Sequence, residues 1–202
     1  LERRQEGGRC DKTIINRMSS LRHHMIKLAR KQRNFRLAAR LLRGKAGALK
    51  FGDLAQYEEA KLLWKRSHSP ANRSAAVIQV YELAARCPLL QKVCGGLRSA
   101  NKVPPGGGDG DVLLASKALL RLADWILAER SLKVLDGQRL CAAGVIGPCA
   151  GGTIPQSVVA RAAGSYLKAA TKISPDLPKV WFQLAAWAYR EALNGVLSGG
   201  GG

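Results

Sequence analysis

Residues 18–43 read MSSLRHHMIKLARKQRNFRLAARLLR, and this stretch decides the fold. Apolar residues recur in its first half at steps of three and four, which places them on one stripe of an amphipathic helix. They are Met18, Leu21, Met25, Leu28 and Ala29. A second helix of the same kind begins after Asn34 and is expected to end at Gly44 and Gly47. Two amphipathic helices joined this tightly must fold back on each other, so the stretch predicts an antiparallel helical hairpin.

The same helical spacing recurs in five further segments of the chain. They are expected at about 53–64, 70–87, 112–135, 159–170 and 178–192. No stretch alternates with a period of two over a useful length, which argues against a sheet. The predicted fold class is therefore all-α: an irregular α-solenoid of antiparallel helical hairpins of the tetratricopeptide or HEAT kind.

Glycine and proline divide the chain into parts. Residues 95–111 read GGLRSANKVPPGGGDGD, which is the composition of a flexible loop. We expect N-terminal helical hairpins with a basic face at 1–94, this loop at 95–111, C-terminal helical hairpins at 112–198, and a disordered glycine tail at 199–202. Because the sequence begins with Leu1 and ends in four glycines, we interpret it as a fragment of a larger protein.

Positive charge is concentrated near the N-terminus. The net charge is +19, and residues 1–50 hold fifteen Lys and Arg against three acids. Six cations on the first two helices are candidates for binding a polyanion: Lys27, Arg30, Lys31, Arg36, Arg40 and Arg43. The alternative is a solvated outer face, or one that meets an acidic protein surface. No aromatic residues alternate with these cations, which weakens an interpretation as a single-stranded RNA site.

Residues that could carry out chemistry are scarce. No Asp-Phe-Gly is present, and the glycine-rich run at 106–111 lacks the Gly-Lys-Ser/Thr ending of a phosphate loop. His23 and His24 are adjacent, so on a helix they point about 100° apart. The five cysteines are scattered and never spaced as C-x-x-C. We therefore predict no catalytic, cofactor or metal residues. With no export signal and no long apolar run, we expect a soluble intracellular protein with no membrane association.

Two segments resemble a known family. Residues 27–38 read KLARKQRNFRLA, and residues 178–185 read PKVWFQLA. They resemble helical hairpins of the FAT region of phosphatidylinositol-3-kinase-related protein kinases, particularly the branch that acts in nonsense-mediated mRNA decay. The resemblance implies a non-catalytic scaffold within a serine/threonine kinase of the cytoplasm or nucleus. Its partners would be the kinase domain, the remaining solenoid and regulatory subunits. Inositol hexakisphosphate, which related FAT regions hold in a Lys-rich pocket, is a possible ligand.

In this interpretation the functional residues are packing residues. Trp181 would fill the gap between helices, and Ala185 would leave room for a neighbour, as in tetratricopeptide repeats. We expect six residues to be buried between helices: Leu28, Ala29, Ala38, Trp181, Leu184 and Ala185. Two alternatives remain open. One is a basic helical domain that binds RNA or polyphosphate through the first fifty residues, and the other is an independent tetratricopeptide-like adaptor for peptides.

Overall fold

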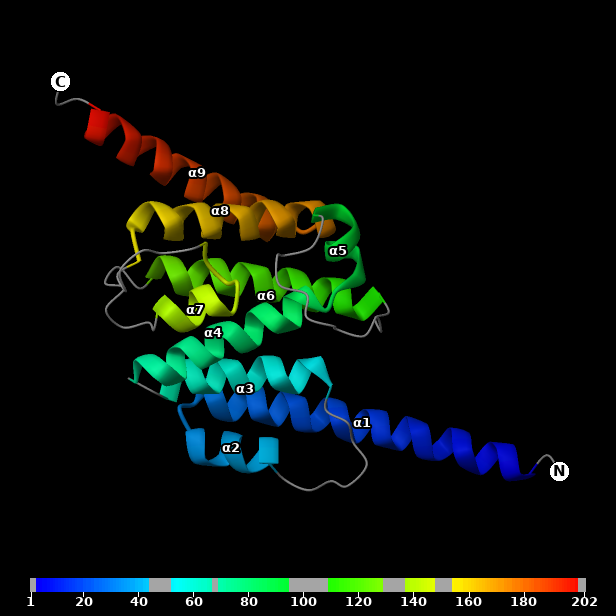
Figure 1. The fold of residues 1–202 in the computed structure, drawn as a ribbon. Helices are drawn as coiled ribbons and strands as arrows, with labels where there is room; N and C mark the ends of the chain where they lie inside the picture. The colour runs from blue at the N-terminus through cyan, green and yellow to red at the C-terminus, as the bar shows by residue number, and fades with distance from the viewer. Residues whose placement is uncertain are drawn as a thin grey trace. The chain divides into compact units, whose positions relative to one another are not determined.

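The computed structural model describes residues 3–43, 52–66, 69–94, 109–128, 137–147 and 154–199. Within these ranges the chain forms nine α-helices and no strand (Figure 1). The predicted all-helical class is therefore confirmed. None of the helices in the described ranges combines the length and the apolar character that crossing a membrane requires. The helices separate into two compact units, residues 1–66 and 67–202.

The first unit contains α1 (Arg3–Lys31), α2 (Phe35–Arg43) and α3 (Asp53–Arg66). All three helices contact one another. Their shared core is small and rich in alanine, with Phe35 and Leu42 packed at its edge. Its buried members are Ala29, Ala38, Ala39 and Leu62. Alanine has almost no side chain, so the helix backbones approach closely at these positions.

The connection between α1 and α2 follows from its residues. Arg33 adopts a left-handed backbone conformation with φ of 61°, which breaks the helical path after Lys31. The amide of Asn34 then donates to the carbonyl of Ala29 at 2.8 Å. The side-chain oxygen of Asn34 accepts a hydrogen bond from the amide of Leu37 at 3.1 Å, which caps the first turn of α2. The predicted bounds of α2 agree with the structure.

The second unit contains α4 (Pro70–Ala85), α5 (Pro88–Cys94), α6 (Asp109–Ala128), α7 (Gly137–Ala142), α8 (Gln156–Ile173) and α9 (Pro178–Gly199). Helix α8 is central, because it packs against α5, α6 and α9. Helix α4 packs against α5, α6 and α7. The core between α4, α6 and α8 consists of aliphatic side chains with almost no exposure, which include Val77, Val80, Leu119, Leu122, Ile126 and Val159.

Two short helices were not predicted from the sequence. The helix expected at 70–87 is followed directly by Pro88, which begins α5, since proline suits the first turn. Helix α7 falls between the segments expected to be helical at 112–135 and 159–170. It forms because Leu140, Val145 and Ile146 are buried. Packing of a few apolar side chains outweighed the local glycine content.

Along the chain the boundary between the two compact units falls after residue 66, whereas the sequence placed the main break at 95–111. Helices from both sides of that loop, α4 and α6, pack together in the second unit. Residues 95–108 lie outside the described residues, as do residues 129–136, which contain the end of the helix expected at 112–135. Helix α9 extends to Gly199, and the rest of the predicted glycine tail also lies outside the described part.

A buried tyrosine ties the segment after α7 to α8. The hydroxyl of Tyr166 donates to the carbonyl of Val145, and the ring meets that of Tyr81 edge-on with centroids 6.1 Å apart. Burial, followed by the neighbouring Tyr81, raises the pKa of Tyr166 well above its ordinary value. The Tyr81 hydroxyl is also buried, but it has no hydrogen-bond partner among the described residues.

This pair allows a matched test of the core. Tyr166→Phe should lower the free energy of unfolding by about 1–3 kcal/mol, because it leaves the buried Val145 carbonyl without its donor. Tyr81→Phe should change the free energy by less than about 0.5 kcal/mol or increase it, because the lost hydroxyl has no partner. Urea unfolding of the full chain, followed by far-ultraviolet circular dichroism, measures both. Equal losses in the two variants would contradict this assignment of the hydrogen bond.

Candidate functional site

The outer face of α1 carries a continuous row of large apolar side chains. They lie at positions 14, 18, 21, 25 and 28, where consecutive steps of four and three residues keep them on one stripe of the helix. We call them the α1 stripe: Ile14, Met18, Leu21, Met25 and Leu28. Each is exposed, by between 45% and 63%. The burial predicted for Leu28 is therefore wrong.

Helix α1 packs through a different face. Ile26 and Ala29 are buried with 1% and 2% exposure, and Ala29 belongs to the core with Ala38. The predicted burial of Ala29 and Ala38 is thus confirmed. Ile26 lies one residue, or about 100° of helix rotation, from Met25. The helix is apolar on two sides, and only one of them meets α2 and α3. The apolar spacing in the sequence identified the α1 stripe, but it did not show that the helix packs through the side with Ile26 and Ala29.

Helix α9 repeats this arrangement in the second unit. Trp181, Phe182, Tyr189 and Leu193 are exposed, Trp181 by 52%. Ala185 is also exposed and Leu184 is half-buried. The burial predicted for Trp181 and Ala185 is therefore wrong. Leu184 was predicted to be buried and is only partly buried. The indole nitrogen of Trp181 donates to the carbonyl of Pro175 at 2.7 Å, which holds the ring against the connector instead of between helices.

Residues that the sequence analysis overlooked attach α9 to its neighbours. Val180 is fully buried at the start of the helix. The Gln183 amide nitrogen donates to the Asp124 carboxylate on α6 at 3.0 Å. The Trp187 ring lies directly on Gly164 of α8, where a Cβ atom would come within 2.3 Å of it. A lone glycine within a helical pattern signals such a close approach, and Gly164 was the available clue.

Clefts lie on both sides of Trp187. One, of about 450 Å³, is lined by residues of α6, α8 and α9, among them Asp124, Leu167 and Arg190. The other, of about 430 Å³, lies along α8 and α9 and includes Arg161, Lys168 and Glu191. The Trp187 ring nitrogen is buried without a hydrogen-bond partner among the described residues.

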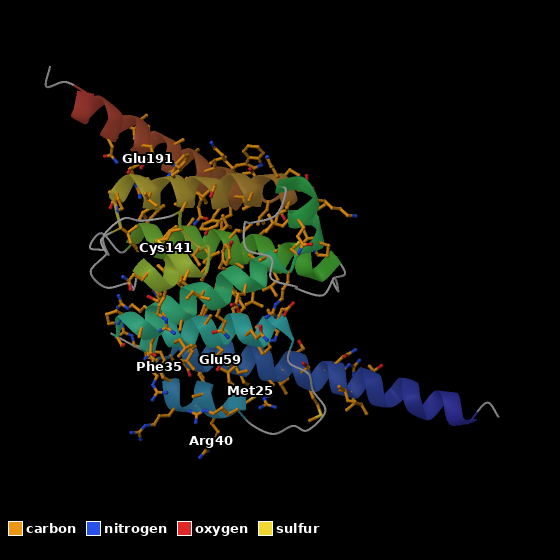
Figure 2. The ribbon with its side chains drawn as sticks, in the orientation of Figure 1. Met25, Phe35, Arg40, Glu59, Cys141 and Glu191 are labelled. Carbon is orange, nitrogen blue, oxygen red and sulfur yellow. The ribbon has the colours of Figure 1, made fainter. Side chains whose placement is uncertain are left out.

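The six candidate cations differ in exposure and in their contacts. Lys27, Lys31, Arg36, Arg40 and Arg43 are exposed. Arg40 extends from the side of α2 that faces away from α1 (Figure 2). Arg30 differs, because it is half-buried and its Nε donates to the Glu58 Oε2 of α3 at 3.0 Å. Arg30 is therefore a structural residue, and five cations remain available to a ligand.

Glu58 is a buried acid in a strongly basic unit. Its side chain is 3% exposed and forms ion pairs with Arg30 and Lys61. Burial alone would raise the pKa of the Glu58 carboxyl, but the hydrogen bonds and charges of Lys61 and Arg30 outweigh burial and lower it. A carboxyl whose pKa is lowered by folding stabilises the folded state at pH values above the ordinary pKa of the carboxyl. This contribution is lost as the pH falls through the lowered pKa of the folded state. Burial also lowers the pKa of nearby His23, against the opposing effect of Glu58.

Groups that could perform chemistry remain separate in the described part of the chain. No cluster of three or more His, Cys, Asp or Glu side chains there could hold a metal ion. Ser116 is fully buried, with its hydroxyl 2.6 Å from that of Ser174. His23 and His24 stand edge-on with ring centroids 6.0 Å apart.

The contact between Gly164 and Trp187 gives a direct test of how α9 is held. Gly164→Ala should lower the free energy of unfolding by about 1–3 kcal/mol and make Trp187 more accessible to acrylamide quenching, because the added methyl group displaces the ring. Gly147→Ala is the matched control, since its Cβ would meet only Val158 at 3.9 Å. Equal stability in the two variants would show that Trp187 does not lie on Gly164.

Comparison with known proteins gives no match. No protein-family model fits the chain, and neither a curated protein nor a solved structure resembles it significantly.

Proposed function

We propose that this chain is a non-catalytic helical scaffold, arranged as an irregular α-solenoid of antiparallel helical hairpins, whose α1 and α9 faces bind neighbouring helices. One observation carries the proposal: both α1 and α9 have two apolar sides, and in each helix the side with the larger residues is exposed. A helix that is apolar on more than one side is typical of the interior of a larger assembly.

The energetics support an unfilled interface. Burying one large apolar side chain contributes about 1.5–3 kcal/mol, and the α1 stripe alone offers five such residues. The outer face of α9 offers four more, three of them aromatic. Repeat arrays need polar outer faces on the repeats at their ends, because an apolar end face promotes aggregation. The described outward side chains of α1 and α9 include large apolar residues, which favours further helices or partner proteins as their covering.

The finer proposal is that this scaffold belongs to the FAT region of a phosphatidylinositol-3-kinase-related serine/threonine kinase that acts in nonsense-mediated mRNA decay. It rests on the sequence resemblance of residues 27–38 and 178–185. In that setting the kinase domain, the remaining solenoid and regulatory subunits would supply the missing helices. The Trp181 position does not add to this proposal, because its side chain is exposed.

A second candidate is binding of RNA or polyphosphate, with inositol hexakisphosphate as one possible ligand. The observation in its favour is the exposure of Lys27, Lys31, Arg36, Arg40 and Arg43. Residues 13–43 contain nine Lys and Arg and no acid, so no carboxylate within this range neutralises them. Such a field supplies salt-dependent attraction but no base specificity.

Immunoprecipitation of the native protein tests the kinase proposal. Polyclonal antibodies raised against the whole 202-residue chain should recognise a polypeptide much larger than 21.7 kDa, and the precipitate should phosphorylate serine or threonine in a peptide substrate. The isolated 202-residue chain should show no phosphotransfer in the same assay. A native protein of only 21.7 kDa without kinase activity would overturn membership of the family.

Two arginine variants separate the polyanion candidate from folding effects. Arg40→Met should leave stability unchanged, whereas Arg30→Met should lower the free energy of unfolding by about 1–3 kcal/mol, because Glu58 keeps only Lys61 as its partner. Calorimetric titration with inositol hexakisphosphate then decides. A severalfold loss of affinity in Arg40→Met would support the polyanion candidate. Equal affinity in Arg40→Met and the unaltered chain would show that Arg40 does not contribute to binding.

A further inference from the structure

We propose that the α1 stripe is the docking site for an amphipathic helix of a partner protein that carries carboxylates along one edge. The inference rests on the proposed scaffold function and specifies the partner of one of its faces. It combines two independent features of α1: the spacing of the exposed apolar residues and the charge of the residues beside them.

The spacing selects a helix as the occupant. Steps of four, three, four and three residues between positions 14 and 28 form the seven-residue repeat of a coiled coil, in which apolar residues occupy the a and d positions. Met18 and Met25 lie at a, with Ile14, Leu21 and Leu28 at d. In a coiled coil, the side chains of a second helix pack into the spaces between the a and d side chains of the first. The stripe is about 21 Å long, which is four turns of helix.

The charge selects the edge of that helix. Arg17, His24 and Lys31 lie seven residues apart along the side of the stripe that faces away from the core residues. These are the g positions of the same repeat, which contact the flanking residues of a partner helix. All three are exposed, and residues 13–43 contain no acid to compensate the charges of Arg17 and Lys31. Asp or Glu at seven-residue intervals on the partner would pair with this edge.

The same charges argue against a second copy of this chain. In a parallel pair, Arg17 of one copy would face Arg22 of the other, which is a pairing of like charges. In an antiparallel pair, the edge with Arg17, His24 and Lys31 would lie against itself. Arg22 is also engaged, since its guanidinium donates to the carbonyl of Leu41 at 2.7 Å. Like-charge contacts of this kind suppress self-association and leave an acidic helix as the complementary occupant.

Three synthetic helical peptides probe the site in the intact 202-residue chain. The first has Leu at a and d and Glu at e and g, the second has Leu with Lys at those flanking positions, and the third keeps Glu but has Ala at a and d. Fluorescence anisotropy should show binding of the first peptide at least about tenfold tighter than that of the other two, because it alone supplies both features. Its own Glu edges repel, so it stays unpaired in solution.

Variants of the chain then locate the site. Leu21→Ser with Met25→Ser should weaken the first peptide about tenfold or more, since both side chains are exposed and the fold does not depend on them. Arg17→Glu with Lys31→Glu should reverse the preference, so that the Lys peptide binds more tightly. Lys65→Glu with Arg66→Glu on α3 makes the same change in net charge away from the stripe and should leave the preference unchanged.

Each contrary outcome has a distinct meaning. Equal binding of the two Glu peptides would identify a general polyanion surface and overturn the inference. A concentration-dependent dimer in sedimentation, lost in the Leu21→Ser and Met25→Ser variant, would identify a second copy as the occupant and also overturn it. Binding of neither Leu peptide to the folded chain would overturn the inference alone, because the native immunoprecipitation tests the proposed kinase membership without these peptides.

Discussion

Close approach of helices across alanine and glycine is the interaction on which both units depend. In the first unit, Ala29 meets Ala38 and Ala39 in the core. In the second, Gly164 allows the Trp187 ring to lie directly on the backbone of α8. Small residues permit this close approach, but each buries little apolar area. The larger apolar side chains of the helices therefore lie outside these contacts. Helices α1 and α9 place many of these groups on the outside.

This placement of small residues inside and large apolar residues outside explains which sequence predictions succeeded. Periodicity identified the helical class and the bounds of α2, because apolar spacing and glycine act locally. It also identified Ala29 and Ala38 as core residues. It failed for Leu28 and Trp181, because a helix with two apolar sides satisfies the same pattern whichever side packs. Only the position of the neighbouring helices decides between the sides, and no local spacing contains that information.

Glu58 shows a second limit of sequence reasoning. In the sequence Glu58 is one acid among many cations, and Arg30 was predicted to be one of six cations that could bind a polyanion. In the structure the two form a buried pair between α1 and α3, completed by Lys61. Removing either charge would leave its partner poorly compensated in a low-dielectric environment. The pair therefore separates the structural cation Arg30 from the five that remain exposed.

The exposed cations and the exposed apolar stripe are best understood together. A surface evolved to hold RNA or phosphate has no use for Met18, Leu21 and Met25 beside its charges, since apolar side chains add nothing to a phosphate contact. A surface evolved for a helix uses both, with the apolar row providing burial and the charged edge selecting orientation and partner. The stripe and the edge share one seven-residue repeat on α1, as the two halves of a single helical contact would.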